Sequence, residues 1–139
     1  MKKILILLAV LTLVMSANVS AQYIDVQIHE YNLPGDYFES DTDDMSRGST
    51  EILYYHFYLM ADGTAYCNYE LTAGVIGYGG TGFDLDYKII KGSGTQTSEI
   101  RGSLGLEVDY VEAVVSIQVD PYGYGAYVYE ANAFASASW

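Results

Sequence analysis

Apolar and polar residues alternate with a period of two over most of the chain beyond residue 21, and no stretch there shows the 3.6-residue period of an amphipathic helix. In residues 23–31, for example, Ile24, Val26 and Ile28 are apolar and the residues between them are polar. Similar patterns recur up to residue 139, separated by short turn signals. Seven or eight such strands predict an all-β fold, either an antiparallel β-sandwich or a jelly-roll-like domain.

The first 21 residues have the pattern of a cleavable signal peptide. Lys2 and Lys3 precede an apolar run over residues 4–14, and small residues precede position 22. The run is shorter than the roughly 20 residues that a spanning helix needs, so no transmembrane helix is expected in the mature chain. We therefore predict residues 1–21 as a signal peptide and 22–139 as one all-β domain. The protein is expected to be secreted, extracellular or at the cell surface, and the periplasm stays open as an alternative.

Charge and composition exclude two broad classes. The chain of 139 residues has 18 acidic and six basic side chains, a formal net charge of −12, and 50% hydrophobic residues. Without the signal peptide, four bases remain against 18 acids. A nucleic-acid partner is not expected, because affinity for phosphate backbones depends on lysine and arginine. Disorder is not expected either, because the apolar content suffices for a core.

The residues of common catalytic sites do not form a recognisable set. His29 and His56, the two histidines, lie in predicted strands with no serine elbow near them. Residues 77–82 match G-x-G-x-x-G, but a strand pattern follows where a dinucleotide site needs a helix. Cys67 is the single cysteine, so it is interpreted as a small buried hydrophobe. We therefore predict that the protein is not an enzyme, although paired carboxylates are numerous enough to leave glycoside hydrolysis open.

Several local signals predict how the strands connect. Residues 32–49 contain a Pro-Gly pair and five acids and are expected to form the longest loop. Asp62-Gly63 predicts a two-residue hairpin that pairs Met60 with Ala65 and Tyr58 with Cys67. The change of phase at Tyr110-Val111 indicates a bulge or a tight turn. Residues 83–90 are expected to form a strand with one apolar and one charged side, and the apolar side consists of Phe83, Leu85, Tyr87 and Ile89.

The acidic part of the predicted loop is a candidate calcium site. Carboxylate oxygens in a loop are the ligands that calcium takes, and Asp41-Thr42-Asp43 has suitable spacing. The EF-hand pattern does not fit, and a solvated acidic loop without metal is the alternative. The candidate ligands for Ca²⁺ are Asp36, Glu39, Asp41, Asp43 and Asp44.

Tyrosine is unusually frequent, with 15 residues in the chain. Its broad apolar ring and hydroxyl suit both protein interfaces and sugar-stacking surfaces, and cross-strand packing in the core is the structural alternative. Tyr122, Tyr124 and Tyr127 are the candidates for stacking on a ligand such as a polysaccharide.

The last predicted strand is uncharged after Glu130. Edge strands are normally protected by charge or proline, so an exposed edge here would favour pairing with a neighbouring subunit. The candidate residues of this assembly strand are Ala131, Ala133, Phe134, Ala135, Ala137 and Trp139.

Together these features favour a secreted, non-enzymatic structural protein. It would self-associate into a homo-oligomer or filament through strand edges and tyrosine-rich faces, with possible help from calcium. The alternative is a carbohydrate-binding or adhesion module that uses surface tyrosines.

Overall fold

The computed structural model describes residues 22–46, 52–80, 82–105, 109–120 and 127–139, and every regular element in them is a β-strand. The predicted signal peptide lies outside these residues. All strand pairs are antiparallel, which confirms the predicted fold class. The strands are β1 (Tyr23–Pro34), β2 (Tyr37–Ser46), β3 (Leu53–Gly63), β4 (Asn68–Gly79), β5 (Gly82–Gly92), β6 (Thr95–Leu104), β7 (Tyr110–Asp120) and β8 (Tyr127–Ser138).

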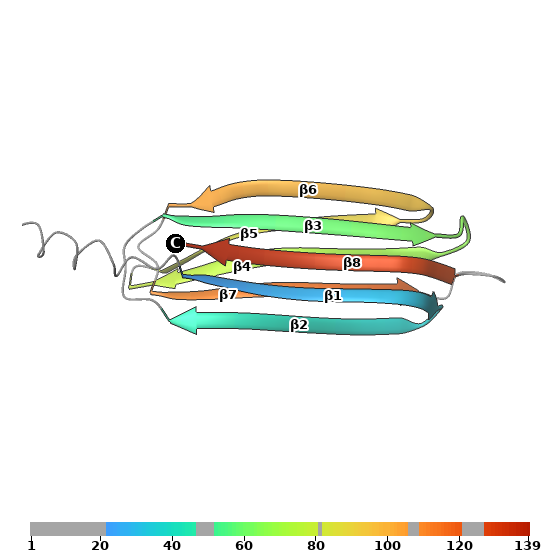
Figure 1. Ribbon diagram of the computed structural model, residues 1–139, viewed down its shortest axis with the longest axis horizontal. Helices are drawn as coiled ribbons and strands as arrows, with labels where there is room; N and C mark the ends of the chain where they lie inside the picture. The colour runs from blue at the N-terminus through green and yellow to red at the C-terminus, as the bar shows by residue number, and fades with distance from the viewer. Residues whose placement is uncertain (1–21, 47–51, 81, 106–108, 121–126) are drawn as a thin grey trace, which may run out of the picture.

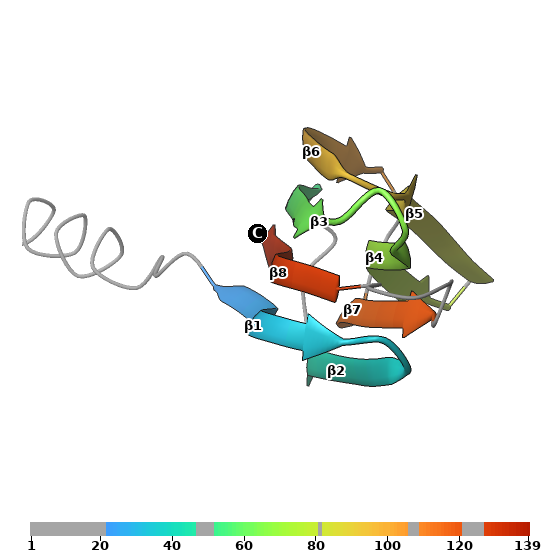
Figure 2. The ribbon, with the colours of Figure 1, turned by 90° about the vertical axis from the view of Figure 1, so that its right-hand side faces the viewer.

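The strands form two four-stranded sheets that stack face to face (Figures 1 and 2). Sheet A has the order β1-β8-β3-β6, and sheet B has the order β2-β7-β4-β5. Among strands that follow one another in the chain, β4 and β5 alone are neighbours in a sheet, and every other connection passes to the opposite sheet. Two sheets wound in this way form a jelly roll.

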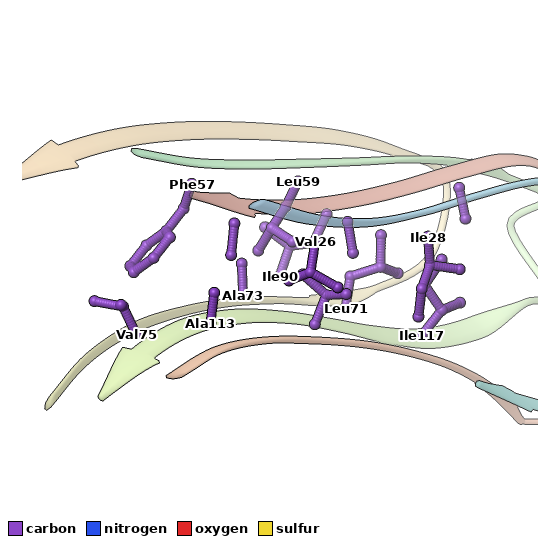
Figure 3. Close-up of a cluster of buried hydrophobic side chains, with 14 of the residues drawn as sticks. Val26, Ile28, Phe57, Leu59, Leu71, Ala73, Val75, Ile90, Ala113 and Ile117 are labelled. Atoms are coloured by element: carbon purple, nitrogen blue, oxygen red, sulfur yellow. The ribbon is translucent and has the colours of Figure 1, made fainter. Parts of the chain in front are cut away.

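The core lies between the sheets and is built mainly from alternate residues of β1, β3, β4, β7 and β8 (Figure 3). Tyr69 and Phe57 are its largest fully buried side chains. Beside β3 in sheet A, β8 contributes mostly small inward side chains: apart from Val128, they are the alanines at alternate positions from 131 to 137, all of which are buried. The alternation in the sequence therefore corresponds to side chains that point in turn into the core and towards solvent.

The strand β8 lies in the middle of sheet A, between β1 and β3 (Figure 1). Ala135, for example, is paired with Val26 on one side and with Phe57 on the other. The predicted exposed edge is therefore wrong. The strand lacks charge because its inward face packs in the core and its backbone groups bond to two neighbours, so no protection against a third strand is needed.

The predicted hairpin at Asp62-Gly63 is also wrong. Both sides of β3 are occupied, by β6 and by β8, so residues 64–73 have no place beside it in sheet A. Instead the amide of Cys67 donates a hydrogen bond to the carbonyl oxygen of Thr64, at 3.1 Å, in a turn that leads the chain into sheet B. Asp62-Gly63 is a suitable sequence for a hairpin turn, but the strand order of sheet A leaves no position for a hairpin partner beside β3.

Two other predicted connections are corrected. Residues 32–49 are not one long loop, because β1 runs to Pro34 and β2 begins at Tyr37, with Asp36 at a φ of 66° between them. The change of phase at Tyr110-Val111 is not a bulge within one strand. It marks the start of β7, which belongs to sheet B, whereas the preceding β6 belongs to sheet A.

Candidate functional site

The acids proposed as calcium ligands lie mostly on β2, an edge strand of sheet B. Glu39, Asp41 and Asp43 are paired with buried residues of β7 and so share its inward face, whereas Asp44 lies on the outward face. The extended strand thus places the carboxylate of Asp44 on the opposite face from the other three, whereas a loop could have brought all four together. Within the described residues, no group of three histidine, cysteine or acidic side chains is arranged to hold a metal ion.

One of these inward acids links the two sheets at their open side. The carboxylate of Asp43 accepts a hydrogen bond of 3.3 Å from the backbone amide of Asp25, which lies on β1, the neighbouring edge of sheet A. Inward charges of this kind hinder the addition of a further strand. The β1 and β2 edges are therefore poor sites for strand pairing between subunits.

The other predicted site residues have different fates. Of the proposed stacking tyrosines, Tyr122 and Tyr124 lie outside the described residues, and Tyr127 is half-buried with its ring 5.2 Å from that of Tyr129. In the proposed assembly strand, the four alanines are buried, and Phe134 lies on the outer face with its ring 5.6 Å from that of His56. The buried alanines are not accessible to a neighbouring subunit.

The outer face of sheet B carries a row of exposed apolar side chains along β5. These residues were predicted to share one side of a strand, and that side faces outward, because their charged neighbours are the ones paired with the inward positions of β4. The exposed fractions are 63% for Phe83, 43% for Leu85, 58% for Tyr87 and 39% for Ile89. We call these four residues the β5 stripe.

The stripe continues across the sheet at one end through aromatic rings. The ring of Tyr78 on β4 lies 6.3 Å from that of Phe83 and 5.8 Å from that of Tyr110 on β7. The hydroxyl of Tyr110 donates a hydrogen bond to Asp44 of β2, and this bond raises the pKa of Tyr110 to about 12. Together these side chains form an aromatic row from β5 to β7, next to β2.

Apart from the buried Ile90, the inward face of β5 carries mainly charged residues. Asp84, Asp86 and Lys88 are paired with inward positions of β4. The described residues contain three lysine and arginine side chains, of which Lys91 is bonded to Glu70 and Arg101 to Glu99. Lys88 is half-buried, and its side chain makes no ion pair or hydrogen bond with any of the residues that the structure describes.

One of these β5 acids bonds to the opposite sheet. The hydroxyl of Tyr55 on β3 donates a hydrogen bond to the carboxylate of Asp86, and this bond, together with burial, raises the pKa of Tyr55 to about 12. The tyrosine side chain passes Gly102 of β6, where any Cβ atom would collide with the hydroxyl. The bond is possible because position 102 has no side chain.

The outer face of sheet A contains a hollow with a volume of 250 Å³. Its floor includes Ser136 and Ser138 of β8, and the taller side chains around it are Tyr54, His56 and Arg101. A small floor between larger walls follows from the pairing of β8 with β3. Exposed aromatic rings beside hydroxyl, imidazole and guanidinium groups can bind a polar ring-shaped ligand.

Charge in this hollow is balanced locally. The carboxylate of Glu99 lies 3.1 Å from Nη2 of Arg101 and 2.8 Å from Nε2 of His56, and these two contacts, the arginine first, lower the pKa of Glu99. The second histidine, His29, lies 2.8 Å from Glu130 on the same face. The hollow thus presents hydrogen-bonding groups without a net cationic surface.

The exposure of the β5 stripe, the unpaired side chain of Lys88 and the hollow were not predicted from the sequence. The alternation of residues 83–90 was visible, but a period of two does not say which set faces inward. The hollow could have been predicted from the small residues Ser136 and Ser138 only if β8 had been known to lie beside the large residues of β3.

Comparisons with known proteins do not assign the chain to a family. No family model and no curated protein matches the chain. Among solved structures, a chain from the structure of infectious bursal disease virus Gx strain aligns with a TM-score of 0.46 at 9% identity, and the alignment covers 86% of this chain and 33% of that chain. TmCBM61 in complex with β-1,4-galactotriose has a TM-score of 0.46 at 13% identity, covering 85% and 88%. Disulfide-linked pili of Bacillus endospore appendages have a TM-score of 0.30 at 13% identity, covering 88% and 91%.

All three TM-scores are below 0.5, so these similarities carry no conclusion about fold or function. The chain spans about a third of the virus chain, so that protein as a whole is not comparable. In the described part of the chain, no helix is long and apolar enough to cross a membrane.

Proposed function

We propose that the protein is an exported, non-enzymatic structural protein that self-associates through β5 and the outer face of sheet B. The observation that supports this proposal is the β5 stripe, in which four large apolar side chains in succession on one face are all more than a third exposed. Contiguous exposed apolar surface on a soluble domain indicates an interaction site. Burial of this apolar surface against a partner would stabilise the complex, because folding of the single chain leaves the surface exposed to water.

The aromatic row extends the surface available to a partner beyond one strand. Tyr78 and Tyr110 add rings that combine apolar area with a hydroxyl and few rotatable bonds, as is favoured at interfaces. The charge of the chain is the opposing term, because two strongly acidic copies repel each other at long range. Added salt screens this repulsion, so association is expected to strengthen between low and physiological ionic strength.

The test is sedimentation velocity of residues 22–139 over a range of concentrations. The native chain is expected to form species larger than a monomer. The double variant Leu85→Ser with Tyr87→Ser should be monomeric at concentrations where the native chain associates. A native chain that stays monomeric at every concentration and salt level would overturn the proposal.

The matched control removes exposed aromatic side chains from the other sheet. Tyr23 and Tyr31 of β1 are 64% and 57% exposed, on the outer face of sheet A. The double variant Tyr23→Ser with Tyr31→Ser should associate like the native chain. Equal loss of association in both double variants would show that the β5 stripe is not the interface.

A second candidate function, the binding of neutral saccharides, is supported by the hollow on sheet A. A sugar ring could stack on Tyr54, which is 57% exposed, while its hydroxyl groups bond to Ser136 and His56. Neutral saccharides are favoured over acidic ones, since the chain is strongly acidic and Glu99 offsets Arg101. The proposed stacking role of Tyr122, Tyr124 and Tyr127 stays a separate prediction.

This second function is tested by affinity electrophoresis in gels that contain neutral polysaccharides of glucose, galactose or mannose. Retardation of the native chain that Tyr54→Ala removes and Tyr31→Ala preserves would support it. Unchanged migration in all three gels would contradict it.

A further inference from the structure

We infer that two copies of the chain pair through antiparallel β5 strands centred on Tyr87, so that their two B sheets become one continuous sheet. This inference rests on the proposed function and specifies its partner and register: a second copy of this chain, with Tyr87 opposite Tyr87. Figure 2 shows β5 at the margin of sheet B, with β4 on one side and no further strand beyond it among the described residues.

Along this margin, backbone amides of β5 donate to side chains of the same strand and not to a neighbouring strand. The amides of Leu85 and Tyr87 each donate, at 2.9 Å, to the side-chain oxygen of the aspartate that precedes them. They are bonded to carboxylates and not to β4, which places these odd-numbered residues towards the free edge. In an antiparallel pair, residues that face each other exchange amide and carbonyl bonds, so odd-numbered residues would pair with odd-numbered residues.

The inward charges then select one register. With Tyr87 opposite Tyr87, Asp86 of each copy lies opposite Lys88 of the other, which gives two opposite-charge pairs. Moving the centre to residue 86 also gives two opposite-charge pairs, Asp84 with Lys88, but it places Asp86 opposite itself. Moving the centre to residue 88 places Lys88 opposite itself. Directly opposed like charges destabilise a strand pair and opposite charges stabilise it, so the register centred on 87 is favoured.

This pairing also gives Lys88 the carboxylate partner that it lacks within the described chain. In the single copy, one oxygen of Asp86 accepts from the amide of Tyr87 and the other accepts from Tyr55. In the pair, the amide of Tyr87 bonds to the opposite carbonyl, which releases the first oxygen for Lys88 of the second copy. The bond to Tyr55 is kept.

The outward side chains of β5 agree with the same register. Leu85 of one copy lies opposite Ile89 of the other, twice, and the two Tyr87 rings lie side by side at the centre. Inward charges on an edge strand normally prevent pairing with other chains. Here an acid precedes Tyr87 and a base follows it. This order disfavours pairing with most other strands, but an antiparallel second copy places each acid opposite a base.

The test is cross-linking of single-cysteine additions with a short bismaleimide after sedimentation has established association. The native chain is the background, because Cys67 is buried and burial raises the pKa of its thiol. Tyr87→Cys should cross-link to itself in high yield. Phe83→Cys should not, because its two copies would lie about 27 Å apart, eight residues along the strands.

Mixed samples provide the decisive arm. Leu85→Cys and Ile89→Cys, when combined, should give a cross-link between the two variants and little of either homodimer. Association without this pattern would overturn the register while leaving the proposed function in place. A chain that remains monomeric would overturn both.

A charge variant tests the same pairs without cysteine. Lys88→Glu should weaken association at least about tenfold, because both opposite-charge pairs become like-charge pairs. Arg101→Glu changes the net charge equally but lies on β6 in sheet A, and it should leave the dissociation constant within about twofold. Equal weakening by both variants would mean that net charge alone is responsible, which would contradict the pairing.

Discussion

The side chain of Tyr55 on β3 crosses the sandwich beside Gly102 and donates its hydroxyl proton in a hydrogen bond to Asp86 on β5. This bond joins an interior strand of one sheet to an edge strand of the other. It also supports β5 close to the point where a second copy is proposed to pair. The local structure therefore depends on three residues from three different strands.

Substitution of Gly102 by alanine should destabilise the domain. The added Cβ would collide with the hydroxyl of Tyr55, whose ring is buried and stacks on Phe57 with centroids 4.6 Å apart, so the ring has little room to move. We expect a loss of roughly 1–3 kcal/mol in the free energy of unfolding, measured in urea. Gly80→Ala is the control, because no atom lies within 4 Å of the added Cβ there. A fully stable Gly102→Ala protein would show that Tyr55 can leave its site cheaply.

Alkaline pH should destabilise the native chain between about pH 10 and 12. The pKa of Tyr55 is raised from 10.0 to about 12 in the folded state, so the folded chain keeps a proton that the unfolded chain releases. The stabilisation is complete below pH 10 and is lost as the pH rises towards 12. Unfolding midpoints in urea at several pH values should fall less steeply for Tyr55→Phe than for the native chain. Tyr54→Phe, on the outer face of the same strand, should behave like the native chain.

Position 135 should not accept a larger side chain. Ala135 is fully buried in the middle of β8, whereas the next residue, Ser136, faces outward. Ala135→Leu is expected to cost roughly 1–3 kcal/mol of stability through overpacking. Ser136→Leu should change stability by no more than about 0.5 kcal/mol. Thermal unfolding followed by circular dichroism compares the two, and similar melting temperatures would contradict the central position of β8.

Calcium should leave the state of association unchanged. Asp44 lies on the opposite face of β2 from Glu39, Asp41 and Asp43, and the described residues contain no group of three or more histidine, cysteine or acidic side chains that could hold a metal ion. Sedimentation in millimolar calcium and in chelator should therefore give the same distribution of species. Larger species that dissolve in chelator would restore the predicted calcium site and require a rearrangement of β2.

The alternation in the sequence was sufficient to predict the fold class and most inward faces. It predicted Ile24, Val26 and Ile28 as buried, and it placed the alanines of β8 together on one face, as the structure shows. Both results follow because period-two alternation is a local property of a strand at the boundary between interior and water.

Strand order and the direction of the β5 stripe could not be predicted from local patterns. Asp62-Gly63 is a good turn, yet β3 pairs with β6 and β8, which are distant in sequence. In β5, apolar residues face water because acids on the inward side of an edge strand reach the rim of the sandwich, where Asp86 meets Tyr55. Such choices depend on partners that only the assembled fold brings near.

The position of β8 also bears on how the chain can fold. This strand is the last of the eight along the chain, yet it separates β1 from β3, and backbone bonds between residues 22 and 139 close the first strand against the last. The pair of β3 and β6 can form before β8 is made, but β1 cannot join sheet A until the last strand has been synthesised. Contacts so distant in sequence favour slow completion of the sheet over early local structure.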